Sequence, residues 1–131
     1  MLQNEQLQII LKRRAKLLAN VRRFFSVRNV LEVNTPILSS AAPTALYLDS
    51  FSTRFEAGSD SKVLYLHTSP EFAMKRLLAA GSGAIYQIAT VFRNGELGRQ
   101  HAPEFSMLEW YRPGFSLTEL MAEVDAFMQQ V

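Results

Sequence analysis

Two stretches in the last third of the chain, 84–92 and 104–112, restrict the fold more than any other feature. The first is an almost continuous apolar run, AIYQIATVF, and the second, EFSMLEWYR, is rich in aromatic residues. A polar segment with two glycines joins them, so together they predict an antiparallel β-hairpin. The period of two sorts the second strand into one face with Phe105, Met107, Glu109 and Tyr111 and another with Glu104, Ser106, Leu108 and Trp110.

Glu109 needs a partner if its face of the hairpin is buried, since an uncompensated carboxylate in the protein interior is costly. Two readings remain open: a structural ion pair with Arg93 across the hairpin, or a site that binds a cation. Residues 93–112 combine guanidinium, aromatic and carboxylate groups. A site that holds a phosphate, a flat base and an ammonium group side by side needs these three kinds of residue, so a site for a nucleotide and an amine is our hypothesis.

The first half of the chain predicts a long helix, an extended segment and a second hairpin. Apolar residues recur at helical spacing over about 4–27, in a stripe that is more often core than interface: Leu7, Ile10, Leu11, Leu18, Val21 and Phe25. Residues 30–38 are extended up to Pro36, and 39–45 form a loop. Strands are expected at 46–55 and 62–68, separated by a turn at Gly58.

Two further helices carry start signals. Thr68 or Ser69 can cap the first, with Pro70 in its first turn and Thr68–Glu71 as a capping box, and Gly81 ends it. Another capping box, Ser116–Glu119, begins the second helix. Its apolar stripe is Leu117, Leu120, Met121, Val124, Phe127 and Met128. Helices mixed with antiparallel strands, without a repeating βαβ unit, predict an α+β fold.

Composition limits the class of protein. A chain of 131 residues with 48% apolar and 20% charged residues is an ordinary globular domain. It has no cysteine and no apolar run of about 18–20 residues, and we expect a cytoplasmic protein without a membrane partner. Net charge is only +2, although basic residues gather in 12–28. A solvated helix face is the favoured interpretation, and a patch for an acidic partner or RNA is the alternative.

Three segments in order resemble the catalytic domain of class II aminoacyl-tRNA synthetases. The basic helix followed by LEVNTP is similar to the first motif, FRNGE followed by HAPEF to the second, and TSPEFAMKRLLAAG to the amino-acid-binding segment of the lysine subgroup. Within that subgroup, MLEWYRP is closest to the ligases that attach β-lysine to translation elongation factor P. The resemblance implies a partial class II antiparallel sheet flanked by helices over residues 1–131, and a homodimer through residues 10–38.

The resemblance also implies roles for single residues. Arg93 would hold the ATP α-phosphate and act catalytically, and Phe105 would stack on adenine. The other expected ATP-binding residues are Asn94, Glu96 and His101. The expected amino-acid pocket for lysine or β-lysine consists of Ser69, Glu71, Glu109 and Tyr111. ATP with Mg²⁺ would be the cofactor, with no metal ligand in this part of the chain, and elongation factor P rather than tRNA would be the acceptor.

The chain departs from the family pattern in three places. Gly95 stands where relatives have a glutamate, with Glu96 beside it, and Ala102 stands where relatives have an asparagine. The third motif, with a second ATP-binding arginine, is not in the sequence. We therefore expect a fragment or truncated paralogue, weak or inactive alone. The alternatives are a non-catalytic paralogue that serves binding or dimerisation, and a fragment of a true lysyl-tRNA synthetase.

Overall fold

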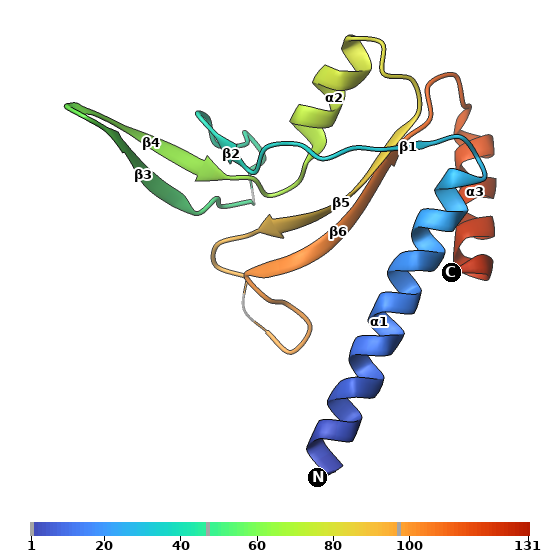
Figure 1. Ribbon diagram of the computed structural model, residues 1–131. Helices are drawn as coiled ribbons and strands as arrows, with labels where there is room; N and C mark the ends of the chain where they lie inside the picture. Colours follow the sequence, from blue (N-terminus) through green and yellow to red (C-terminus); the bar gives the residue numbers. More distant parts are fainter. Residues whose placement is uncertain (1, 47, 97) are drawn as a thin grey trace.

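The computed structural model describes residues 2–46, 48–96 and 98–131. Three helices and six strands follow one another in this part of the chain without a repeating unit (Figure 1). Their bounds are α1 Leu2–Ser26, β1 Leu31–Glu32, β2 Leu38–Ser39, β3 Ser52–Ala57, β4 Asp60–Leu66, α2 Glu71–Ala79, β5 Ile85–Phe92, β6 Glu104–Tyr111 and α3 Leu117–Gln130. No helix within these ranges is long and apolar enough to cross a membrane.

The strands form two sheets of three. One has the order β1-β5-β6 and the other the order β2-β4-β3. All neighbours are antiparallel except β1 and β5, which run parallel from the pair Leu31 and Ile85. The α+β prediction is therefore confirmed, and the β5–β6 hairpin lies where its alternation placed it.

The core lies between the β5–β6 hairpin and the two long helices. Figure 1 shows α1 and α3 side by side against the hairpin, while β3 and β4 project away from it. Phe25 of α1 stacks on Tyr86 with ring centroids 4.4 Å apart, and Phe24 meets Phe127 of α3 edge-on at 5.2 Å. These rings hold the helices against one face of the sheet and leave its other face for different contacts.

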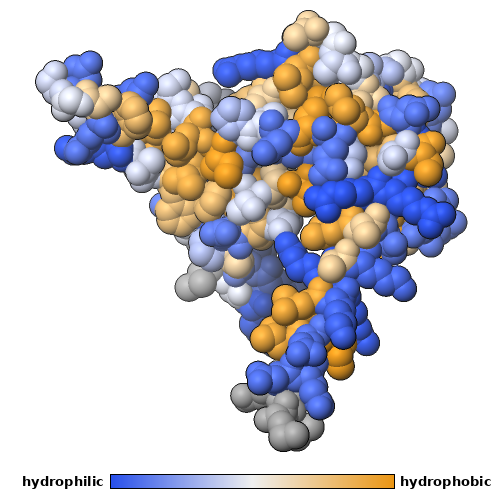
Figure 2. Space-filling model, in the orientation of Figure 1, coloured by the Kyte–Doolittle hydropathy of each residue, from blue (hydrophilic) through white to orange (hydrophobic). Residues whose placement is uncertain are grey.

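The first half of α1 extends beyond this core. Leu7 is 53% exposed, Ile10 61% and Leu11 56%, whereas Val21, Phe24 and Phe25 are buried. The predicted stripe is therefore buried only in the last two turns of the helix, and its first half is not core within this chain. Figure 2 shows apolar side chains at the surface of the projecting part of α1.

The orientation of α3 also differs from the prediction. Leu117 and Met128 are each 74% exposed and Met121 is 60% exposed, so most of the expected apolar stripe faces outward. The buried residue of the helix is Glu123. Its carboxylate is bound by Trp110 and Arg112 of the hairpin end, and these polar contacts turn the helix away from the orientation that its apolar stripe indicated.

Two local predictions were wrong: the Thr68–Glu71 capping box of α2 and the start of the strand expected at 46–55. The N-cap of α2 is Pro70, which has no side-chain acceptor, and the hydroxyl of Ser69 accepts the amide of Glu71 at 3.4 Å. The Glu71 carboxylate reaches forward to Lys75, so the predicted Thr68–Glu71 capping box is not formed among the described residues. The strand expected at 46–55 begins only at Ser52. Upstream of it, Asp49 forms a backbone bridge with Asn94 and is drawn out of the sheet; Tyr47 is outside the described residues.

Candidate functional site

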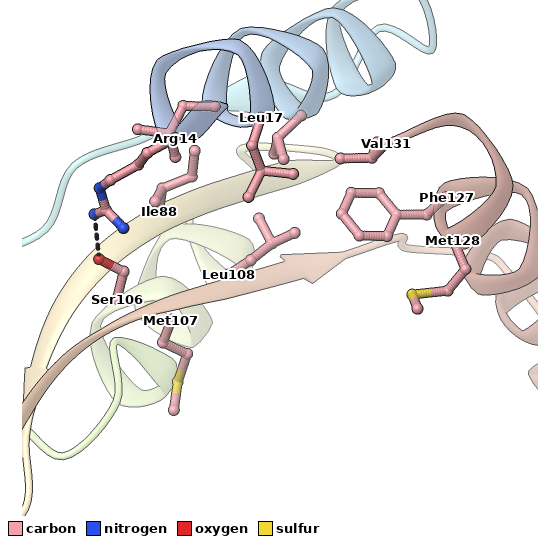
Figure 3. Close-up of a pocket in the computed structure, with 11 residues that line it drawn as sticks. Arg14, Leu17, Ile88, Ser106, Met107, Leu108, Phe127, Met128 and Val131 are labelled. Atoms are coloured by element: carbon pink, nitrogen blue, oxygen red, sulfur yellow. Dashed lines mark hydrogen bonds between the residues drawn. The ribbon is translucent and has the colours of Figure 1, made fainter. Parts of the chain in front are cut away.

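One face of the β5–β6 hairpin carries the residues in question. The register pairs Val91 with Phe105, Gln87 with Glu109 and Ile85 with Tyr111, and residues opposite each other in an antiparallel pair share a face. The other face, with Leu108 and Trp110, packs on the core. In Figure 3, Leu108 points towards α1 while Met107 points to the opposite side of the sheet. The predicted sorting of the second strand into two faces thus agrees with the structure.

Arg93 follows the last residue of β5 and is held from three sides. Its guanidinium carbon lies 5.2 Å from the centroid of the Phe105 ring, within the range of a cation–π contact. Its Nε donates a long bond of 3.5 Å to the carbonyl of Thr68, and its Nη1 lies 3.6 Å from Oε1 of Glu96. The side chain is 24% exposed, so the guanidinium is oriented but still reachable by an anion.

The turn before α2 approaches the same face. Thr68, whose carbonyl receives Arg93, is buried, and the next residue, Ser69, accepts the amide of Glu71 on its hydroxyl at 3.4 Å. The Glu71 carboxylate forms an ion pair of 2.6 Å with Lys75 and is 46% exposed. This arrangement places a backbone carbonyl, a hydroxyl and a carboxylate of one short turn next to the hairpin.

Tyr111 and Glu109 form the acidic end of the face. The Tyr111 hydroxyl donates a short hydrogen bond to the Glu109 carboxylate. Burial, this hydrogen bond and the negative charges of Glu109 and Glu71 together raise the pKa of Tyr111 well above its ordinary value. Glu109 of β6 contacts the phenol directly, and the charge of Glu71 from α2 adds the smallest of these contributions. Two acidic groups around a phenol make a pocket end that suits an ammonium group.

The alternative ion pair between Arg93 and Glu109 is not formed in the described part of the chain; Arg93 pairs with Glu96, and Glu109 with Tyr111. Across the hairpin Glu109 instead faces Gln87. The guanidinium of Arg93 and the carboxylate of Glu109 therefore lie at different places on one face of the hairpin. The predicted structural ion pair between them was wrong.

Gln87 and Thr35 are residues that sequence reasoning missed. Gln87 is only 3% exposed, and its Oε1 accepts a hydrogen bond of 3.0 Å from the hydroxyl of Thr35, which is 7% exposed. The pair ties the extended segment before Pro36 to the strand opposite Glu109. An amide inside the apolar run AIYQIATVF was the available signal, since a buried amide must find a partner.

The remaining predicted residues lie in the loop between β5 and β6. Asn94 is exposed and donates its backbone N–H to the carbonyl of Asp49 at 2.9 Å. His101 is exposed and bridges to Gly98 through the backbone, at the outer end of the loop. Glu96 turns back to Arg93. The described contacts thus join Glu96 to the Arg93 group but leave Asn94 and His101 at its edge.

A cavity of about 400 Å³ lies on the other side of the sheet, between α1, the hairpin and α3 (Figure 3). Its walls are mostly apolar, and its polar side chains are Arg14 and Ser106, which bond to each other at 2.9 Å. None of the residues predicted to bind the nucleotide or the amino acid lines this cavity. Within the described ranges no three histidine or acidic side chains cluster as metal ligands.

The comparisons with known proteins agree on one family. The family profile described as "tRNA synthetases class II (D, K and N)" matches residues 1–131. Proteins named elongation factor P–(R)-β-lysine ligase are 57% identical in Haemophilus influenzae (strain PittGG), 58% in Pseudoalteromonas translucida and 54% in Yersinia pestis. Each alignment spans 123 residues, which is 92% of this chain and 38% of the relative.

The profile match spans residues 1–131. The segments that resemble the motifs of the family lie on one hairpin and its neighbouring helices. The chain spans about two-fifths of the length of the curated relatives it matches. On the evidence of the profile and of these relatives, the chain belongs to the class II tRNA synthetase family for aspartate, lysine and asparagine.

Proposed function

We propose that residues 1–131 are part of the catalytic domain of an ATP-dependent ligase, which activates lysine or β-lysine and transfers it to a lysine of translation elongation factor P. The observation that carries the proposal is the division of one hairpin face into a guanidinium–aromatic end, Arg93 with Phe105, and an acidic end, Glu109 with Tyr111. The names of the relatives add the acceptor and the amino acid.

The guanidinium–aromatic end suits a nucleotide. In this proposal Arg93 binds the α-phosphate through its planar, bidentate donors and Phe105 stacks on the base. Asn94 and His101 line the nucleotide from the loop, and Glu96 lies beside the guanidinium of Arg93. The bond from Arg93 to the Thr68 carbonyl and the Phe105 ring beside it restrict the guanidinium before any ligand arrives, which lowers the entropic cost of binding.

The acidic end suits a diamine. Glu109 and Tyr111 take one ammonium group, while Ser69 and Glu71 border the pocket from the α2 turn, so two carboxylates from different elements can hold two positive charges. The phenol of Tyr111 is protonated at neutral pH, and a neutral hydroxyl beside a carboxylate serves both as donor and as acceptor.

The chemistry requires no nucleophile from the protein. The carboxylate of the amino acid attacks the α-phosphorus of ATP and pyrophosphate leaves. The acceptor amine then attacks the acyl carbon of the adenylate, an amide bond forms, and AMP and a proton are released. The protein's contribution is to position the two substrates and to stabilise negative charge on the α-phosphate, which is the task of Arg93. Magnesium would accompany ATP and neutralise its phosphates, but the described residues contain no metal-ligand cluster, so none is assigned to it.

A homodimer through residues 10–38 belongs to the same proposal. The supporting observation is the projecting half of α1, where Ile10 and Leu11 are more than half exposed. Apolar side chains on a regular helix face are typical of subunit contacts. A non-catalytic paralogue that retains this surface is the second candidate, favoured by Gly95 and Ala102, which replace polar residues of the family pattern.

ATP–pyrophosphate exchange, measured with the whole ligase of which residues 1–131 are proposed to be a part, tests the proposal. Exchange should depend on lysine or (R)-β-lysine and should fall at least about 100-fold in Arg93→Ala, because Arg93 stabilises charge in the transition state. The matched control is Arg54→Ala, which removes an exposed arginine of β3 far from the site in sequence. Exchange that Arg93→Ala leaves unchanged, or no exchange with either amino acid, would reject the enzymatic function and favour the binding module.

A further inference from the structure

The carboxylate of Glu96 forms an ion pair with Arg93, the residue that binds phosphate in the proposed function. Oε1 of Glu96 lies 3.6 Å from Nη1 of Arg93, with 30% of the Glu96 side chain and 24% of the Arg93 side chain exposed. We infer that Glu96 competes with nucleotide phosphate for the Arg93 guanidinium and thereby sets the nucleotide affinity of the site. The inference rests on the proposed function, since it assumes that Arg93 binds phosphate.

The path of the backbone explains why Glu96 returns to Arg93. Two backbone hydrogen bonds of 2.9 Å anchor the start of the loop, from Arg93 N–H to the Pro103 carbonyl and from Asn94 N–H to the Asp49 carbonyl. Gly95 then takes a φ of +78°, a left-handed conformation that glycine adopts without strain. This turn reverses the chain directly after the anchored pair, and the next side chain, that of Glu96, comes back over the guanidinium.

The nitrogens of the Arg93 guanidinium have different partners, so Glu96 and a phosphate compete for only part of the group. Nε is engaged with the Thr68 carbonyl, on the side of the α2 turn, whereas Nη1 faces Glu96. Carboxylate and phosphate oxygens bind the same N–H donors of a guanidinium. An incoming phosphate that binds Nη1, alone or together with Nη2, must therefore displace the Glu96 carboxylate, while the contact of Nε with Thr68 keeps the side chain in place.

The ion pair between Arg93 and Glu96 is weak enough for a phosphate to replace the Glu96 carboxylate. Partly exposed ion pairs contribute little to stability, since water screens them and both side chains lose freedom. The triphosphate of ATP as a whole carries more negative charge than one carboxylate and can replace it at the guanidinium. The opposite role, in which Glu96 orients Arg93 for phosphate, makes the reverse prediction: removing the carboxylate would then weaken nucleotide binding.

Calorimetric titration of the whole protein with ATP and Mg²⁺ separates the two roles. Glu96→Gln should lower the dissociation constant of ATP about two- to fivefold, the range expected for loss of a partly exposed ion pair. The control is Glu104→Gln, which makes the same change of charge at an exposed position at the start of β6 and should leave the affinity unchanged. Equal or weaker binding by Glu96→Gln, or the same gain in Glu104→Gln, overturns the inference.

A second measurement requires no nucleotide and keeps the inference distinct from the proposed function. Phenylglyoxal modifies arginines more rapidly when no carboxylate holds the guanidinium, and mass spectrometry reports the rate at Arg93 alone. Modification of Arg93 should be about two- to fivefold faster in Glu96→Gln than in the unmodified sequence or in Glu104→Gln. Equal rates overturn the inference even if ATP binds. Failure of every variant to bind ATP would count against the proposed function instead.

Discussion

Trp110 donates its indole N–H to the carboxylate of Glu123 over 3.1 Å, and this bond joins the end of the hairpin to α3. Arg112 adds an ion pair, with its Nε 3.3 Å from the other carboxylate oxygen of Glu123. That N–H is not directed at the oxygen, so the contact is electrostatic rather than a hydrogen bond. Phe115 covers the guanidinium at 4.3 Å, which shields the group from water.

Replacement of Glu123 by alanine should destabilise the protein by about 3–5 kcal/mol, because it leaves the buried guanidinium of Arg112 without a counter-charge. Urea unfolding followed by Trp110 fluorescence measures the loss. Ser116→Ala, which removes the N-cap side chain of the same helix, is the comparison, with an expected loss of about 1 kcal/mol. A loss below about 1 kcal/mol for Glu123→Ala would show that the network does not hold α3 in place.

The phenol of Tyr86 should lose its proton at a higher pH than an ordinary tyrosine does. Burial, followed by its hydrogen bond of 2.9 Å to Glu32, raises the pKa of Tyr86 to about 12. The folded chain therefore retains a proton that the unfolded chain loses near pH 10, so the free energy of unfolding falls as the pH rises from about 10 to 12. Below pH 10 the contribution is complete. Ultraviolet absorbance of the phenolate against pH, with unfolding measured at each pH, checks both statements.

Tyr86→Phe provides the control for this titration. The variant should lack the absorbance step near pH 12 and should show a smaller loss of stability between pH 10 and 12 than the parent chain. A tyrosine absorbance step near pH 10 that disappears in Tyr86→Phe would contradict the assignment, because it would place an ordinary phenol at this position.

Thr35→Val should cost about 1–3 kcal/mol, since it removes the donor to a buried amide oxygen of Gln87 while it preserves the shape of the side chain. Thr35→Ser keeps the hydroxyl and is the matched control, with most of the stability retained. Chemical denaturation of both variants gives the difference. Equal stability of the valine and serine variants would mean that the hydrogen bond to Gln87 does not contribute.

Ile10→Lys tests the proposed dimer. Ile10 is 61% exposed, so the change should leave the fold of one subunit intact and place a charge in the proposed contact. We expect a dimer of the parent chain by sedimentation velocity and an increase of at least about tenfold in the dimer dissociation constant of the variant, equal to about 1.4 kcal/mol. Glu56→Lys on β3 is the control. A monomeric parent chain at micromolar concentration would contradict the dimer.

Local patterns predicted those parts of the fold that local interactions determine. The β5–β6 hairpin and its two faces followed from alternation alone, and the Ser116–Glu119 capping box is present, since both of its partners lie within one helical turn. The α2 capping box failed where a competitor was available: Lys75, one turn ahead, takes the Glu71 carboxylate.

Contacts between distant residues could not be predicted from periodicity. The orientation of α3 depends on Glu123 meeting Trp110, thirteen positions away, and the buried Gln87 finds Thr35 across 52 positions. Polar partners of this kind outweigh an apolar stripe because a buried polar group without a partner is costly. For the candidate site, residue types suggested the chemistry, but only the structure shows that Arg93 pairs with Glu96 and Glu109 with Tyr111.

The central claim is that one hairpin face binds both parts of an aminoacyl-adenylate, the nucleotide at Arg93 and Phe105 and the amine at Glu109 and Tyr111. Calorimetric binding of a non-hydrolysable lysyl-adenylate analogue tests it most directly. We predict binding to the parent chain that falls at least about tenfold in both Arg93→Ala and Glu109→Gln, the loss expected from one charge-assisted hydrogen bond. Binding that both variants retain undiminished would contradict the claim.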